Sequence, residues 1–189
     1  MENPKEIVEQ VWKPITEFLR IPAGIKPALH IVDKSPFGTR DISECPDHVI
    51  VSYCEKKLKE ELAALGTAVD FKKLLAYALA ESLAMGAQKM LIADKCSKNC
   101  SNCRAFCKSK EFKRLNYVTT YYIADHVMLK LFNENQFGMN QILRHISNES
   151  ATLICKALEQ VYARSDSDEF IRSISCRGDL TFSDVFAFK

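Results

Sequence analysis

The sequence contains no proline after Pro46, and all six prolines lie among the first 46 of its 189 residues. Because proline interrupts the interior of helices, this absence leaves the rest of the chain free to form long helices. The prolines themselves predict turns and irregular backbone where they occur. We therefore expect two parts, an irregular proline-containing N-terminal arm over residues 1–46 and a helical domain over residues 47–189.

Long apolar runs are also missing. No stretch of 18 consecutive apolar residues occurs, so the sequence predicts no membrane span and no membrane partner. The first ten residues, MENPKEIVEQ, lack the apolar run of a secretory signal peptide. A cytoplasmic location is the resulting expectation. In a reducing compartment, clustered cysteines are more often metal ligands or catalytic groups than disulfides.

A strong overall charge is absent too, since 26 basic and 24 acidic residues leave a net charge of +2. This balance points to no particular partner. The distribution is uneven, however. Residues 95–114, called the basic segment below, carry seven basic residues and one acidic residue, Glu111, which gives a net charge of +6 there and −4 over the remainder.

Cysteine, by contrast, is plentiful and clustered. Four of the eight cysteines fall within residues 96–107, which read CSKNCSNCRAFC and are called the cysteine segment below. Four thiolates can complete a tetrahedral zinc site or hold a [4Fe-4S] cluster, and the sequence does not separate these two cofactors. The predicted metal ligands are Cys96, Cys100, Cys103 and Cys107.

The geometry of the cysteine segment leaves two conformations open. A straight helix through it would place its end cysteines about 16 Å apart, too far for one metal with bonds of about 2.3 Å. Either the segment forms a compact loop that gathers all four sulfurs, or it stays helical and the cysteines act in pairs. The intervening serines and asparagines are turn formers and favour the loop.

Other interpretations of the cysteines remain open. They could be buried as small apolar residues, pair as disulfides or form a thiol redox switch. The first three also share the Cys-x3-Cys-x2-Cys spacing of radical-SAM enzymes. Those enzymes carry the motif after an early strand of a long α/β barrel, whereas here it follows an expected long helix in a short chain.

The basic residues around the cysteines have two possible roles. They can offset the negative charge of a thiolate-bound metal centre, and they can contact a nucleic-acid backbone or an acidic protein partner. We expect contacts to a nucleic-acid backbone from the basic side chains that lie between the cysteines and directly after them, namely Lys98, Arg104, Lys108, Lys110, Lys113 and Arg114.

Apolar spacing of three and four residues predicts the secondary structure. Helices are expected near residues 4–18, 47–65, 70–93, 116–133, 139–146, 150–163 and 166–176. A short strand is possible at residues 30–32, and residues 180–188 are expected to form a strand or a docked tail. The fold class is therefore all-α or nearly so, a single helical bundle of about six or seven helices with the cysteine segment as an insertion loop. The helix pair at 139–163 is loosely similar to a DNA-reading helix-turn-helix.

Together these features predict a cytoplasmic, metal-binding helical protein that acts as a regulatory or nucleic-acid-associated binding module. One alternative is an iron–sulfur redox protein or enzyme. Another is a structural or oligomerisation protein with buried thiols. The sequence contains no phosphate-binding loop, zinc-protease helix or Ser/His/Asp constellation, so it leaves open whether the protein is an enzyme.

Overall fold

The structure, a computed structural model, describes residues 3–32, 38–39, 47–66, 69–95 and 109–188. Helices hold more than half of the 189 residues, which confirms the predicted helical class. The long helices are α1 (Pro4–Leu19), α3 (Phe71–Lys95) and α5 (Lys110–Phe132). The shorter helices are α2 (Glu55–Leu65), α6 (Phe137–Gln141), the 3-10 turn η2 (Leu143–His145), α7 (Glu149–Tyr162), α8 (Ser167–Ser175) and α9 (Phe182–Val185).

A small three-stranded sheet accompanies the helices. Its order is β1 (Lys26–Ile31), β3 (His48–Tyr53) and β2 (Gly38–Thr39), with β3 in the middle. Strand β1 runs parallel to β3, with Lys26 opposite His48, and β2 runs antiparallel to it. Along β3, buried positions alternate with partly exposed ones, so one face of the sheet packs on the core.

The predicted helix over residues 47–65 is therefore wrong in its first third. Residues 48–53 read HVIVSY, and their β-branched and aromatic side chains alternate as a half-buried strand requires. The helix begins only after Cys54, which is the N-cap residue of α2. The misleading signal was that apolar residues at positions 50, 54, 58 and 62 also fit a helical period.

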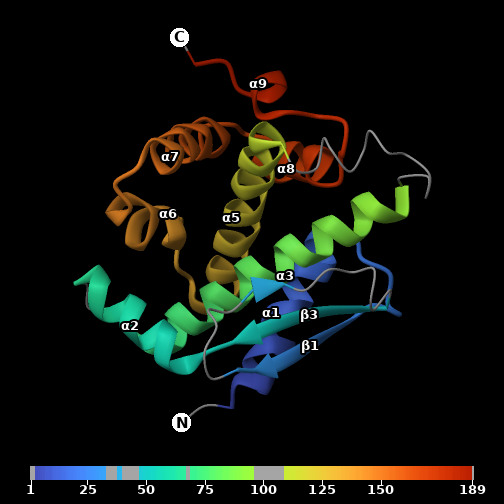
Figure 1. The fold of residues 1–189 in the computed structure, drawn as a ribbon. Coiled ribbons are helices and arrows are strands. Elements are labelled where there is room, and N and C mark those ends of the chain that lie inside the picture. The colour runs from blue at the N-terminus through green and yellow to red at the C-terminus, as the bar shows by residue number, and fades with distance from the viewer. Residues whose placement is uncertain (1–2, 33–37, 40–46, 67–68, 96–108, 189) are drawn as a thin grey trace.

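Helices α3 and α5 form the centre of the molecule. Figure 1 shows α3 lying along the sheet with α1 beside it, while α5 crosses α3 steeply and leads to α6, α7 and α8 at the opposite end. Alanines and leucines on α3 are buried on most of its surface, including Ala80, Leu83 and Ala84. The chain enters the cysteine segment from the end of α3 and leaves it into the start of α5, so the segment connects the two central helices.

A buried polar cluster fixes α3 against α5. Gln88 on α3 is fully buried, and its side-chain amide donates a hydrogen bond to Oγ1 of Thr120 at 2.9 Å. The hydroxyl of Thr119 donates to the Gln88 carbonyl oxygen at 2.5 Å. Because both polar ends of Gln88 are satisfied, the cluster sets the register between the two helices. The chain therefore enters and leaves the cysteine segment from helices with a fixed relative position.

Helix α5 begins six residues before the predicted start at Asn116. Its N-cap is Ser109, whose hydroxyl oxygen accepts a hydrogen bond from the backbone N–H of Phe112 at 3.1 Å. The helix ends at Phe132, where Asn133 adopts the left-handed conformation typical of a C-terminal cap. The earlier start places the last part of the basic segment on the same helix as the tyrosines at 117 and 121.

The C-terminal third differs from the prediction in two places. The expected helix at 139–146 is a short helix and a 3-10 turn separated at Ile142, whose backbone angles are not helical. Residues 180–188, expected as a strand or a docked tail, form a single helical turn, α9, followed by a docked tail. Phe182 and Phe186 are buried there, with their ring centroids 5.2 Å apart. Helices α7 and α8 match the predicted ranges to within a residue or two.

Elements on both sides of residue 46 share one hydrophobic core. Val11 and Ile15 on α1 belong to the same buried cluster as Val51 on β3 and Leu83 on α3. The division into an arm over 1–46 and a helical domain over 47–189 stays a prediction from composition.

In the described ranges, none of the helices combines the length and apolar character that crossing a membrane requires.

Candidate functional site

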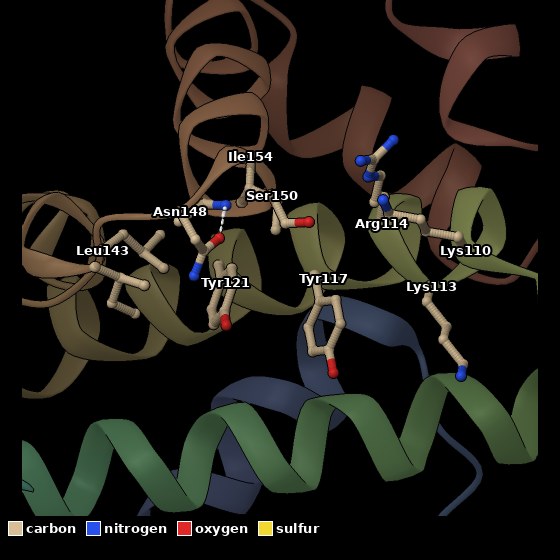
Figure 2. Close-up of a pocket in the computed structure, with 11 residues that line it drawn as sticks. Lys110, Lys113, Arg114, Tyr117, Tyr121, Leu143, Asn148, Ser150 and Ile154 are labelled. Atoms are coloured by element: carbon tan, nitrogen blue, oxygen red, sulfur yellow. Dashed lines mark hydrogen bonds between the residues drawn. The ribbon is translucent and has the colours of Figure 1, made fainter.

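A groove of about 270 Å³ lies between the first half of α5 and the chain that runs from η2 into α7. Figure 2 shows the side chains that line it. The α5 wall is basic and aromatic, and it consists of Lys110, Lys113, Arg114, Tyr117 and Tyr121. The opposite wall is mainly apolar with two polar residues, and it consists of Leu143, Ile146, Asn148, Ser150, Ala151 and Ile154.

The α5 wall follows directly from helical spacing. Lys113, Tyr117 and Tyr121 are four residues apart, so their side chains leave α5 on one face in successive turns. The two tyrosine rings lie nearly parallel, with their centroids 5.9 Å apart and an angle of 18° between the planes. The groove therefore has a cation at one end and a stacked aromatic pair along its side.

Two of the groove residues expose large apolar surfaces. Tyr117 is 37% exposed and Ile146 is 40% exposed, and each faces solvent at the groove. Tyr121 is partly buried, and burial together with the nearby carboxylate of Glu81 raises the pKa of its hydroxyl. Tyr121 therefore serves as the inner support against which the more accessible ring of Tyr117 is held.

Two of the three basic residues at the groove carry charge that no carboxylate offsets within the described residues. Lys110 and Lys113 are exposed, and within the described part of the chain neither has an ion-pair partner. No aspartate or glutamate belongs to the described residues that line the groove. Such a surface attracts anions and repels cations over distances of about 10 Å at moderate ionic strength.

Arg114 is held in place by two carboxylates beside the groove. Its Nη1 donates to Oε1 of Glu111 at 3.1 Å, and its Nη2 lies 4.0 Å from Oε1 of the exposed Glu149. The other oxygen of Glu111 accepts hydrogen bonds from the backbone N–H and the hydroxyl of Ser183 at 3.1 and 2.6 Å. The hydrogen bond from Ser183, followed by that from Arg114, lowers the pKa of Glu111. The docked tail therefore positions Arg114.

The opposite wall is shaped by the start of α7. Asn148 is the N-cap residue, and its Oδ1 accepts a hydrogen bond from the backbone N–H of Ala151 at 2.8 Å, the dashed line in Figure 2. The positive end of the α7 dipole thus faces the same space as the cations of α5. The groove can bind a ligand that carries a negative charge next to a flat or apolar group.

The sequence-predicted site residues divide into two sets. The groove brings together Lys110, Lys113 and Arg114, which are three of the six predicted nucleic-acid contacts. The others, Lys98, Arg104 and Lys108, and the four predicted ligands Cys96, Cys100, Cys103 and Cys107, lie outside the described residues. Within the ranges that the structure describes, no three His, Cys, Asp or Glu side chains are grouped so that they could hold a metal ion.

Three cysteines belong to the described residues, and none of them lines the groove. Cys54 is buried at the start of α2, and Cys155 and Cys176 are partly buried on α7 and after α8. Burial raises the pKa of the Cys155 thiol, which disfavours the thiolate that metal binding or nucleophilic chemistry would need. This environment fits a packing role for Cys155.

Sequence reasoning missed the aromatic half of the groove. The apolar spacing predicts a helix that starts only at Asn116, which leaves the basic residues in the preceding loop and apart from Tyr117 and Tyr121. The signal that could have found them is Ser109, a serine three residues before Phe112 at the start of an apolar run, which is a common N-cap pattern. Extending the helix to Lys110 would have aligned Lys113 with Tyr117.

Glu81 lies on α3 near Tyr121, and its carboxylate is partly buried. Burial, with a smaller contribution from Glu61, raises its pKa from 4.5 to about 7. The folded state therefore holds the proton more tightly than the unfolded state. Between pH 4.5 and 7 the unfolded chain loses this proton first, so the contribution of Glu81 to stability is lost as the pH rises.

Replacing Glu81 by glutamine should remove this pH-dependent penalty. At pH 8 we expect the free energy of unfolding of Glu81→Gln to exceed that of the wild type by on the order of 2 kcal/mol, and near pH 4.5 the two should be equal. Urea unfolding at the two pH values measures the difference. The exposed Glu60→Gln serves as a control with little change at either pH, and an equal effect of Glu81→Gln at both would contradict the burial argument.

Comparison with known proteins finds no family model that matches the chain and no curated protein or solved structure that matches it. The functional argument therefore depends on the chemistry of the groove and of the cysteine segment.

Proposed function

We propose that this protein is a cytoplasmic metal-binding module that associates with nucleic acid through its basic segment. The observation that carries the proposal is the convergence of Lys110, Lys113 and Arg114 on one groove that also contains an exposed tyrosine ring. Cations that track a phosphate backbone beside an aromatic side chain are the usual combination in proteins that bind nucleic acid without strong sequence preference.

The metal part of the proposal comes from the cysteine segment. Cys96, Cys100, Cys103 and Cys107 would bind zinc or a [4Fe-4S] cluster, which would cross-link the segment and hold its basic residues in a fixed arrangement. The segment joins α3 to α5, and Gln88 fixes these two helices against each other. A closed segment would then extend the positive surface of the groove by Lys98, Arg104 and Lys108.

A charge reversal at the groove tests the nucleic-acid part. Replacing Lys113 by glutamate removes one phosphate contact and adds a repulsion, each worth about 1 kcal/mol at the surface, so we expect affinity to fall roughly thirtyfold at low salt. The loss should be similar for oligonucleotides of different sequence, because phosphate contacts carry no base information. Fluorescence anisotropy with labelled oligonucleotides provides the measurement.

The matched control is Lys130→Glu, which makes the same charge change at an exposed position near the other end of α5. It should alter affinity by less than about twofold, since it lies about 25 Å along the helix from Lys113. Equal losses for both variants would indicate an effect of net charge alone. Absence of binding to any DNA or RNA at low salt would remove the proposal.

A further inference from the structure

The groove combines features that a phosphate backbone alone does not use. Tyr117 and Ile146 are two of the four most exposed large apolar side chains among the described residues, and both border the same groove. Tyr117 is further held in a nearly parallel stack on Tyr121. An exposed, pre-oriented aromatic face next to three cations suits a ligand with a flat apolar part and an attached anion.

We propose that this groove takes an unpaired base of a single-stranded nucleic acid, so that the protein prefers single strands to duplexes. The base stacks on the exposed face of Tyr117, and Ile146 adds apolar surface to the same groove. The phosphate next to that base lies against Lys113, whose side chain leaves α5 on the same side as the Tyr117 ring. This inference rests on the proposed function and adds two statements to it. The nucleic acid is single-stranded, and Tyr117 is the residue that contacts its base.

The dimensions of the groove fit this occupant. A volume of about 270 Å³ lies just below the usual lower limit for drug-sized ligands, so the space is large enough for a single base. A duplex keeps its bases inside and presents only phosphates and groove edges, so it would leave Tyr117 and Ile146 uncovered. Unpaired bases, by contrast, stack on aromatic side chains with little dependence on sequence.

The charge pattern favours nucleic acid over an acidic peptide. An acidic peptide would satisfy Lys110 and Lys113 but would bring no flat π surface for Tyr117. Asn148 adds a further match, because its Oδ1 is occupied by the Ala151 N–H while its Nδ2 is a donor on the wall opposite Tyr117. That amide can donate to an acceptor on a base edge, and every base has such acceptors.

The test compares a single-stranded oligonucleotide with an abasic strand of the same length and phosphate charge. For the wild type, removal of the bases should weaken binding by roughly tenfold, the effect of one lost stacking contact. Tyr117→Ala should weaken binding of the normal strand by a similar factor and leave binding of the abasic strand and of a duplex unchanged. Tyr117→Phe, which keeps the ring, should bind within about twofold of the wild type.

Leu129→Ala is the matched control, since it truncates another exposed apolar side chain on α5, 42% exposed, away from the groove. It should not change the affinity for any of the three ligands. Equal wild-type affinity for the normal and the abasic strand would overturn the base-binding inference while leaving the backbone proposal intact. Equal displacement of the oligonucleotide by polyglutamate at matched charge would point to an acidic protein partner and would also overturn it. Absence of binding to all strands would remove both proposals.

Discussion

Serine in place of Cys100 or Cys103 is expected to abolish stoichiometric metal binding and to lower the melting temperature of the protein. Each thiolate supplies one of four ligands, and a site with three thiolates and a hydroxyl binds zinc or a four-iron cluster far more weakly. Because thiolates repel one another without the ion, metal binding and local folding are coupled in such a segment. The measurement is metal content per chain, by elemental analysis of protein purified without oxygen, together with thermal unfolding.

Cys155→Ser is the control for this experiment. Its thiol is partly buried on α7 with a raised pKa, so we expect the metal content of this variant to equal that of the wild type. An absorbance band near about 400 nm would assign the metal as iron–sulfur, and colourless protein with one zinc per chain would assign zinc. Metal-free wild-type protein, or unchanged metal after both Cys100→Ser and Cys103→Ser, would contradict the predicted centre.

Alanine in place of Gly138 is expected to destabilise the fold by about 3 kcal/mol, the upper end of the range for overpacking. A Cβ atom at this position would lie 1.9 Å from the hydroxyl oxygen of Tyr77 and 2.3 and 2.6 Å from two of its ring carbons. Tyr77 is 1% exposed, so its ring has no empty space to move into. The backbone at Gly138 is also held in place, because its N–H donates a hydrogen bond to Oδ1 of buried Asp125 at 2.5 Å. Urea unfolding measures the loss.

The same clash predicts a specific rescue. In Tyr77→Leu the side chain is shorter, so adding Gly138→Ala should cost much less than it costs in the wild type, with a coupling of at least about 1 kcal/mol. Gly24→Ala is the matched control, because a Cβ there would meet nothing within 4 Å. Additive effects of Gly138→Ala and Tyr77→Leu would show that the two residues do not compete for the same space.

The long helices were predictable because helix propensity and apolar spacing, two independent signals, indicated the same structure. Around α3, strong helix formers such as alanine and leucine coincide with an apolar pattern from Phe71 onward, and no proline interrupts it. The same holds for α7, where Asn148 caps a regular apolar period. In such stretches propensity, pattern and cap all favour one structure, and tertiary context has little left to decide.

Strand β3 shows where this reasoning fails. Apolar residues at 50, 54 and 58 satisfy a helical period. Within residues 48–53, however, Val49, Val51 and Tyr53 satisfy a strand period. Pairing with β1, which lies about twenty residues earlier in the chain, decides in favour of the strand over the helix. Local sequence carries no information about that distant partner, so the strand could not be predicted from its own residues alone.

The groove was predictable only in part, for a similar reason. The basic half was visible as charge density, since Lys110, Lys113 and Arg114 follow the cysteines closely. The other half comes from Ile146 and Asn148, about thirty residues later, and they reach α5 only because η2 and α7 fold back onto it. Their contribution depends on tertiary packing, which the spacing of apolar residues in the local sequence does not reveal.

The most direct test of the account is the affinity of the wild-type protein for a single-stranded oligonucleotide measured over a series of salt concentrations. On single strands the logarithm of the binding constant falls with the logarithm of the salt concentration by about 0.7 for each phosphate neutralised. Three cations, Lys110, Lys113 and Arg114, predict a slope of about −2, and addition of Lys98, Arg104 and Lys108 predicts about −4. A slope in this range would support the account. A slope near zero, or no binding at the lowest salt concentration, would contradict it.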